Sequence, residues 1–294
     1  MKFTDVLCAL IVIIVWGGNF VAMRFSAQEV PPYFLLGMRL AIASAVLLWF
    51  TRSPRGMIFP LILISSTLCT LHFGLAMIGV QHIEAGAAAI AMQITVPFAA
   101  LLAWLIYREK FGWYRTAGMV LSFTGIAIIS GMPRIAMHIE MFVVMLVSAL
   151  FFAVATIQIR RLGKVDFMSI NAWVSIFGLP QAFLISWLCE SGQIEALEQA
   201  DLSVYAAFIY MGLVASVVGQ GLWYRLVQRY PTNQIMPFTI LVPVVGVALG
   251  VLFLNEVLSW LLIFGGVLTV LGVTIIILHR SQFGTAEALG NRRS

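Results

Sequence analysis

The chain is a succession of apolar runs, each about 20 residues long, with short polar breaks between them. A helix needs about 20 mainly apolar residues to cross the hydrocarbon core of a bilayer. Lipid offers the backbone no hydrogen-bond partners, so apolar runs of this length are expected to be helical. The sequence therefore predicts an all-α integral membrane protein with ten transmembrane helices. The predicted spans are residues 6–25, 33–51, 57–79, 85–106, 112–131, 138–160, 166–188, 204–225, 233–254 and 259–278.

The composition excludes a soluble globular fold. Of the 294 residues, 62% are hydrophobic and 10% are charged, whereas soluble domains carry about 25% charged residues. So few charges would not solvate a soluble protein of this length, and we expect the lipid bilayer as a partner and no nucleic acid. The histidines and cysteines lack metal-ligand spacing and predict neither a metal nor a cofactor. They are His72, His82, His138, His279, Cys8, Cys69 and Cys189.

The positive charges are distributed unevenly among the breaks. With a cytoplasmic N-terminus, 14 of the 17 Lys and Arg residues fall in cytoplasmic segments, Arg24 and Arg134 fall outside, and Arg39 lies within a span. Lys and Arg concentrate on the cytoplasmic side of membrane proteins. We therefore expect both termini to be cytoplasmic, in a multi-pass protein of the cell inner membrane. The longest break, 189–202, would lie outside and has room for a short surface helix.

The two halves of the sequence share landmarks. In each half a Val-Pro pair is followed by a Glu and, four residues later, by a Trp: Val96-Pro97, Glu109 and Trp113 in the first, and Val242-Pro243, Glu256 and Trp260 in the second. We interpret both glutamates as charges at the start of the following helix. The pattern predicts five-helix repeats at 1–133 and 134–280, with a disordered tail at 281–294. Five is odd, so the second repeat would be inverted, a plan typical of secondary transporters.

Several motifs resemble, in order and over nearly the whole chain, those of the EamA-type branch of the drug/metabolite transporter superfamily. They are Val15-Trp16-Gly17-Gly18-Asn19-Phe20-Val21, the stretch 30–40 with Pro31-Pro32 and Arg39, and the stretches 215–230 and 241–246. Within that branch the chain is most similar to bacterial amino-acid exporters of the O-acetylserine/cysteine kind. The resemblance implies ten helices in two inverted halves around a central cavity, and export of amino acids or related small polar metabolites. It does not fix the substrate.

Arg39 is the most informative single residue. It lies about seven positions into the second span, roughly 10 Å below the outer interface. An arginine at such a depth costs roughly 2.5–3.5 kcal/mol even on the mildest insertion scale. Its guanidinium would suit a substrate carboxylate, which it can hold with two hydrogen bonds. The alternatives are that the side chain reaches outward to the interface, or that it pairs with Glu29 or Glu84.

Two prolines predict matched interruptions in the fourth and ninth spans. Pro97 removes the hydrogen bond to the carbonyl of Gln93, and Pro243 does the same at Thr239. Interrupted helices at corresponding positions of two repeats indicate a binding site, so Gln93 is a candidate for lining the pathway. The alternative is a packing kink whose free carbonyl is satisfied by a neighbouring hydroxyl or by water.

Other polar and aromatic residues at helical spacing are further candidates for substrate binding. Each has the alternative of bonding a neighbouring helix or anchoring the span at the interface. These candidates are Trp16 and Asn19 in the first span, His72 in the third, and Gln220, Trp223 and Tyr224 in the eighth.

The sequence favours a secondary transporter over the other function classes. It contains no G-x-x-x-x-G-K-[ST] loop for nucleotide hydrolysis and no H-E-x-x-H or similar catalytic set, so we expect no enzyme and no catalytic residues. A multidrug carrier would favour a carboxylate within a span, and a nucleotide-sugar carrier would favour several cations there. A proton relay would have to use His72 or a border carboxylate such as Glu84. Proton antiport and passive export both remain open, as does the oligomeric state.

Overall fold

The structure is a computed structural model that describes residues 1–51, 54, 56–107, 112–162, 165–230 and 232–278. This part of the chain is helical and contains no β-strand. Glu109 and the predicted tail 281–294 lie outside the described residues.

The helices follow one another with short connections. The first half comprises α1 (Phe3–Ala27), α2 (Pro32–Leu47), η1 (Leu48–Phe50), α3 (Ile58–Ser65), η2 (Ser66–Phe73), α4 (Gly74–Val80), α5 (Ala85–Ala91), η3 (Met92–Ile94), α6 (Thr95–Tyr107) and α7 (Trp113–Ser130). The second half comprises α8 (Pro133–Ala136), α9 (Ile139–Arg161), α10 (Phe167–Cys189), α11 (Gln193–Gln199), α12 (Leu202–Ile209), η4 (Tyr210–Gly219), α13 (Gln220–Arg229), α14 (Thr232–Thr239), α15 (Leu241–Leu254) and α16 (Trp260–Leu278). The short surface helix predicted for 189–202 is α11.

Nine candidate membrane spans are present among the described residues, and each coincides with a predicted span. Five of them join several helical segments. In these spans α2 continues into η1, α3 through η2 into α4, α5 through η3 into α6, α12 through η4 into α13, and α14 into α15. The predicted span 112–131 is the helix α7, which has 18 residues. Its first turn contains Trp113, Tyr114 and Arg115, so it is less apolar than the other nine.

Two long helices change their winding at corresponding places in the chain. The segments η2, in the third predicted span, and η4, in the eighth, are both π-helices. A π-helical turn is wider than an α-helical one and is frequently found at functional sites. Since the third and eighth spans are counterparts in the predicted repeats, the same irregularity occurs once in each half.

Helices α7 and α16 pack backbone to backbone. A Cβ atom added at Gly118 would lie 2.7 Å from the carbonyl oxygen of Gly272, and one added at Gly265 would lie 2.7 Å from the carbonyl oxygen of Gly125. Both distances are too short for a real Cβ, so only glycine fits at these crossings. Small residues permit this kind of close approach between membrane helices.

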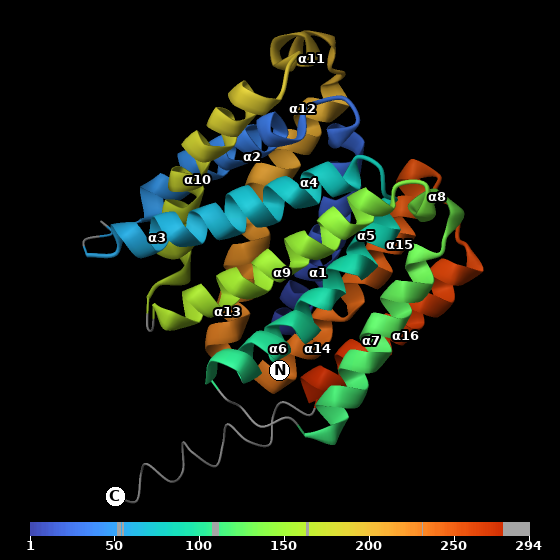
Figure 1. Ribbon diagram of the computed structural model, residues 1–294. Coiled ribbons are helices and arrows are strands. Elements are labelled where there is room, and N and C mark those ends of the chain that lie inside the picture. Colours follow the sequence, from blue (N-terminus) through green and yellow to red (C-terminus); the bar gives the residue numbers. More distant parts are fainter. Residues whose placement is uncertain (52–53, 55, 108–111, 163–164, 231, 279–294) are drawn as a thin grey trace, which may run out of the picture.

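The helices form one bundle whose two ends can be told apart in Figure 1. The short helices α8 and α11 lie at one end, which we call the α11 end. The N-terminus and the last turn of α16 lie at the opposite end, which we call the N-terminal end (Figure 1). One large core cluster extends through both halves, from Met23 of α1 to Leu262 of α16.

Candidate functional site

The guanidinium of Arg39 lies inside the bundle between the two halves. Its Nε donates to the hydroxyl Oγ of Ser216 in η4 at 3.0 Å, and its Cζ lies 4.4 Å from the ring centroid of Phe73 in η2. The residue is 5% exposed, and its Nη1 is buried without a hydrogen-bond partner. The first half therefore supplies a buried cation that the second half orients through one hydrogen bond.

Neither alternative arrangement of Arg39 is present. The carboxylate of Glu84 pairs with Arg134 at 2.7 Å, and Glu29 is exposed after the end of α1. Burial of Arg39 also means that its side chain does not extend to the interface. Within the described part of the chain, no carboxylate lies within ion-pair distance of this guanidinium.

The two π-helices supply the partners of Arg39, and the sequence analysis missed both partners. Ser216 donates its hydroxyl hydrogen to the carbonyl of Met211, five residues earlier, at 2.8 Å. The backbone carbonyl of Ser216 accepts from the side-chain amide of Asn171 in α10 at 2.9 Å. A wide π-turn thus fixes the Ser216 hydroxyl against Arg39. No turn residue or motif in the sequence marks this change of winding.

An aromatic pair lies further along the same helix toward the N-terminal end. The rings of Trp16 in α1 and Trp223 in α13 are 5.3 Å apart at an interplanar angle of 56°. Gly219 packs against Trp16, since a Cβ there would lie 3.0 Å from the indole Nε1. Ser216, Gly219 and Trp223 follow at steps of three and four residues, so Trp223 lies about 10 Å along the helix from Ser216. Trp16 and Trp223 therefore lie on the path from Arg39 to the N-terminal end.

The remaining candidates on these two helices are half-buried. Gln220 and Tyr224 are on α13, three residues before and one residue after Trp223. The side-chain amide of Asn19 donates to the sulfur of Met23 at 3.1 Å, and its carbonyl oxygen is buried without a partner. Asn19 thus retains an acceptor for a ligand or a water molecule.

Gln93 and Thr239 meet at the two predicted interruptions. The helix that begins with α5 narrows to the 3₁₀ segment η3 around Gln93, and the helix that begins with α14 breaks after Thr239. The side-chain Nε2 of Gln93 donates to the carbonyl oxygen of Thr239 at 3.4 Å, which is the carbonyl that Pro243 leaves without an amide donor. The matched interruptions are confirmed, and they contact each other across the two halves.

His72 is part of a contact between two helices. Its Nδ1 lies 3.0 Å from the hydroxyl and 3.1 Å from the carbonyl oxygen of Ser148 in α9, and Ser148 Oγ donates to the His72 carbonyl at 2.9 Å. Its ring stacks on Phe73 and Phe152. His72 therefore links the third and sixth spans and reaches the Arg39 cluster through Phe73.

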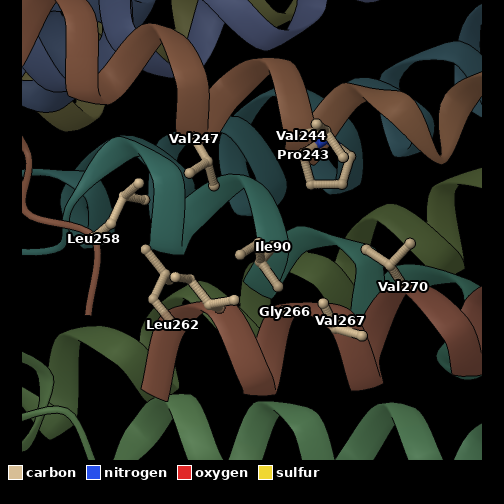
Figure 2. Close-up of a pocket in the computed structure, with 10 residues that line it drawn as sticks. Ile90, Pro243, Val244, Val247, Leu258, Leu262, Gly266, Val267 and Val270 are labelled. Carbon is tan, nitrogen blue, oxygen red and sulfur yellow. The ribbon is translucent and has the colours of Figure 1, made fainter. Parts of the chain in front are cut away.

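An apolar cavity of about 230 Å³ opens on the side of the bundle, between α5, α15 and α16. In Figure 2, Ile90 of α5 lies between Pro243 and Val247 of α15 on one side and Leu262 and Gly266 of α16 on the other. Its lining is apolar and includes none of the candidate residues. It is unsuited to a polar ligand. No cluster of three or more His, Cys, Asp or Glu residues that would hold a metal occurs in the described ranges.

Comparisons with known proteins fit this architecture. A protein of known crystal structure superposes with a TM-score of 0.65 at 15% sequence identity, covering 96% of this chain and 100% of that chain, which shows the fold. The "Probable amino-acid metabolite efflux pump" of Salmonella typhimurium (strain LT2) is 27% identical over 99% of this chain and 100% of the relative. Its counterpart in Escherichia coli (strain K12) is 26% identical over 94% and 95%. A "Probable terminal-alkyne amino-acid exporter" of Streptantibioticus cattleyicolor is 26% identical over 100% and 97%.

The sequence profile of one family matches the chain twice, once in each half. The EamA-like transporter family matches residues 4–131 and again residues 140–278. These two matches cover nearly all of the described helices, and they confirm the family resemblance read from the motifs. The chain is a membrane protein that belongs to the EamA-like transporter family.

Proposed function

We propose that this protein exports amino acids or related small polar metabolites across the cell inner membrane by alternating access. The names of its relatives in Escherichia, Salmonella and Streptantibioticus, all exporters of amino acids or their metabolites, support the substrate class. The proposal describes a transporter and not an enzyme, because the sequence offers no catalytic set. Passive export and proton antiport are both compatible with it.

The proposed topology has ten spans in two inverted repeats, 1–133 and 134–280, with both termini cytoplasmic. The helix α7 would be the fifth span, since it packs along the whole of α16, its counterpart in the second repeat. The location of the N-terminus and the end of α16 at the same end of the bundle supports an even number of crossings (Figure 1). The excess of Lys and Arg in the segments on that side supports a cytoplasmic location. The α11 end would then face outward.

The observation that carries the proposal is the buried, unpaired guanidinium of Arg39. Placing a cation within a membrane span costs free energy, and such residues generally mark functional sites. The substrate carboxylate would supply the missing counter-ion and accept from Nη1, while Ser216 keeps Nε in place. A guanidinium holds a carboxylate through two parallel bonds. Since Arg39 belongs to the first half and Ser216 to the second, the substrate would bind where the halves meet.

The other candidates have supporting roles in this proposal. Trp16 and Trp223, with Gln220, Tyr224 and Asn19, would line the route between Arg39 and the cytoplasm. Gln93 would line the interruption opposite Thr239, and His72 would position Phe73 beneath the guanidinium. A carrier for cationic drugs is less well supported, because the buried carboxylates Asp5 and Glu84, among the described residues, lie near the ends of the bundle and already have partners.

Uptake into inverted membrane vesicles tests the proposal. Labelled cysteine, O-acetylserine, threonine and homoserine would be offered to wild-type protein, Arg39→Ala and Arg39→Lys, together with cysteamine, which is cysteine without its carboxylate. We expect uptake of at least one amino acid, no competition by cysteamine, and loss of uptake in Arg39→Ala. Arg39→Lys should retain the charge but bind more weakly, since lysine lacks the planar fork.

Arg161→Ala is the matched control, because it removes an exposed arginine in the last turn of α9. It should leave uptake unchanged. Uptake of carboxylated substrates by Arg39→Ala at the wild-type rate would exclude the anchor role.

A further inference from the structure

Two carboxylates of the second half hold the start of two helices of the first half. Glu190, which follows α10, accepts hydrogen bonds from the backbone amides of Tyr33 and Phe34 at the start of α2, at 2.8 and 3.1 Å. Each oxygen of the carboxylate takes one amide. The first amides of a helix have no partner within the helix and carry partial positive charge, so they favour a carboxylate.

Glu256 makes the equivalent contact at the start of α5. Its two carboxylate oxygens accept from the amides of Ala85 and Gly86, the latter at 2.9 Å. Asn255, at φ 53°, turns the chain back so that Glu256 points into the bundle. A Cβ at Gly250 would clash with the carboxylate of Glu256, so this position of the carboxylate depends on glycine there. The interpretation of Glu256 as a charge on its own following helix is therefore wrong, because it caps a helix of the other half.

Neither of these helices has a side-chain cap of its own. The residues before them, Pro31 for α2 and Glu84 for α5, make no capping hydrogen bond. The connections within the first half are instead held by first-half residues. Arg24 donates to the carbonyls of Val80, at 2.8 Å, and Gln81. The carboxylates of Glu190 and Glu256 are thus the capping groups of α2 and α5, and they come from the other half.

The two capped helices carry proposed substrate contacts. Arg39 lies seven residues after Pro32, the first residue of α2, and Gln93 lies eight residues after Ala85, the first residue of α5. Each contact is therefore about two turns from a cap. Hydrogen bonds from amides to a carboxylate are stronger than those between neutral groups, but water replaces them when they break, so a conformational change can open such a cap. Opening either cap would free the end of a helix that holds the substrate.

We propose that Glu190 and Glu256 form the outer gate of the transporter, closing the α11 end by capping α2 and α5 and thereby positioning Arg39 and Gln93. This inference rests on the proposed alternating-access function and orientation. Both carboxylates would separate from the first half when the transporter opens outward. The charged neighbours of Glu256 are Glu84 and Arg24, and Glu84 in turn pairs with Arg134.

Labelling of Cys69 with a membrane-impermeant maleimide tests the gate. Cys69 lies in η2, four residues before Phe73, and is 2% exposed. Cys8 and Cys189 would be replaced by serine so that Cys69 is the only thiol. Glu190→Gln and Glu256→Gln would be compared with the parent in right-side-out and inverted vesicles. We expect outside labelling to accelerate about fivefold, the factor that matches loss of one helix N-cap, with no acceleration from the cytoplasmic side.

Glu195→Gln is the matched control, because Glu195 is an exposed carboxylate on α11 at the same end. Acceleration from both sides would indicate general loosening and would overturn the proposal, as would equal acceleration in Glu195→Gln or wild-type rates in both gate variants. If one variant does not fold, the other tests the proposal alone. Labelling needs no transported substrate, so a wrong substrate class would show in the uptake assay and leave this result unchanged.

Discussion

The side-chain amide of Gln93 donates to the backbone carbonyl of Thr239, and that carbonyl is free because Pro243 has no amide hydrogen. The contact joins the fourth span of one half to the ninth span of the other. Both partners lie at interrupted turns, where the helices can bend without losing further hydrogen bonds. The two interruptions therefore form one polar contact between the halves, which we call the Gln93–Thr239 joint.

Replacing Pro243 with alanine should uncouple this joint. The substitution returns an amide to the helix, so Thr239 regains its intrahelical bond and Gln93 loses its acceptor. Pro243 lies in the first turn of α15, where proline is tolerated, so we expect little change in the melting temperature in detergent but lower uptake, because interrupted helices at corresponding positions form the binding sites of such transporters. Pro180→Ala is the control, since Pro180 lies inside α10 and is exposed. Full activity in Pro243→Ala would show that the joint is only a packing feature.

Removing the hydroxyl of Ser216 should weaken substrate binding without abolishing transport. The hydroxyl orients Nε of Arg39, and loss of one such bond is worth about 1 kcal/mol, or about fivefold in KM. Ser216→Ala should therefore raise KM for carboxylated substrates and leave the maximal rate nearly unchanged. Ser44→Ala is a suitable comparison, because Ser44 is a buried hydroxyl on α2 whose oxygen has no partner. An unchanged KM in Ser216→Ala would remove Ser216 from the site.

Removing a contact at the N-terminal end of the bundle should speed labelling of Cys69 from the cytoplasmic side, whereas removing one at the α11 end should speed labelling from outside. Asp5 is 1% exposed, accepts from the hydroxyl of Tyr230 at 2.7 Å, and lies 3.5 Å from Nη1 of Arg229. These contacts join α1 of the first half to the end of α13 in the second. Tyr230→Phe removes the hydroxyl bond, so Cys69 should become more reactive in inverted vesicles by about fivefold.

Tyr205→Phe serves as the control for Tyr230→Phe, because the Tyr205 hydroxyl donates to Leu197 at the other end of the bundle. It should leave cytoplasmic labelling unchanged. If Tyr230→Phe speeds labelling from the outside instead, Asp5 and Tyr230 do not close the cytoplasmic side.

An added methyl group at Gly125 should destabilise the protein. Its Cβ would clash with the hydroxyl of Thr269 and would lie 2.5 Å from the carbonyl oxygen of Gly265 and 2.6 Å from the amide nitrogen of Thr269, and these backbone atoms cannot move aside. Overpacking of this kind costs about 1–3 kcal/mol, so the melting temperature in detergent should fall. Gly112→Ala is matched to it, because a Cβ there meets nothing within 4 Å. Equal stability of the two variants would contradict the close packing of α7 and α16.

The sequence predicted the helices and several parts of the site because those features depend on local chemistry. Span positions follow from the length of each apolar run, and the interruptions at Gln93 and Thr239 follow from the missing amide of proline. The position of Arg39 within a span follows from the sequence in the same way, and the structure selects burial of its side chain among the alternatives that the sequence left open. The partners of Arg39 were not predicted. Ser216 is 177 residues away in the sequence and reaches Arg39 through a π-turn, which no residue type indicates.

The gate carboxylates were missed for a similar reason. A glutamate just before a helical run is normally interpreted as a charge at the start of that helix, and from the sequence alone we assigned Glu256 this role. Its actual partners, Ala85 and Gly86, are 171 and 170 residues away. Which amide a carboxylate reaches depends on how the two halves pack, and that packing is encoded by many weak contacts over the whole chain.

The crossings of α7 and α16 have a mechanical consequence. Where glycines bring the two backbones into contact, few side-chain atoms lie between the helices that could deform. The pair α7 and α16 can therefore stay together and act as the axis about which the two halves rotate. In Figure 1 the helices α2 and α10 lie on the opposite flank of the bundle. Displacement in a rocking motion grows with distance from its axis, so the largest travel would fall on α2 and α10.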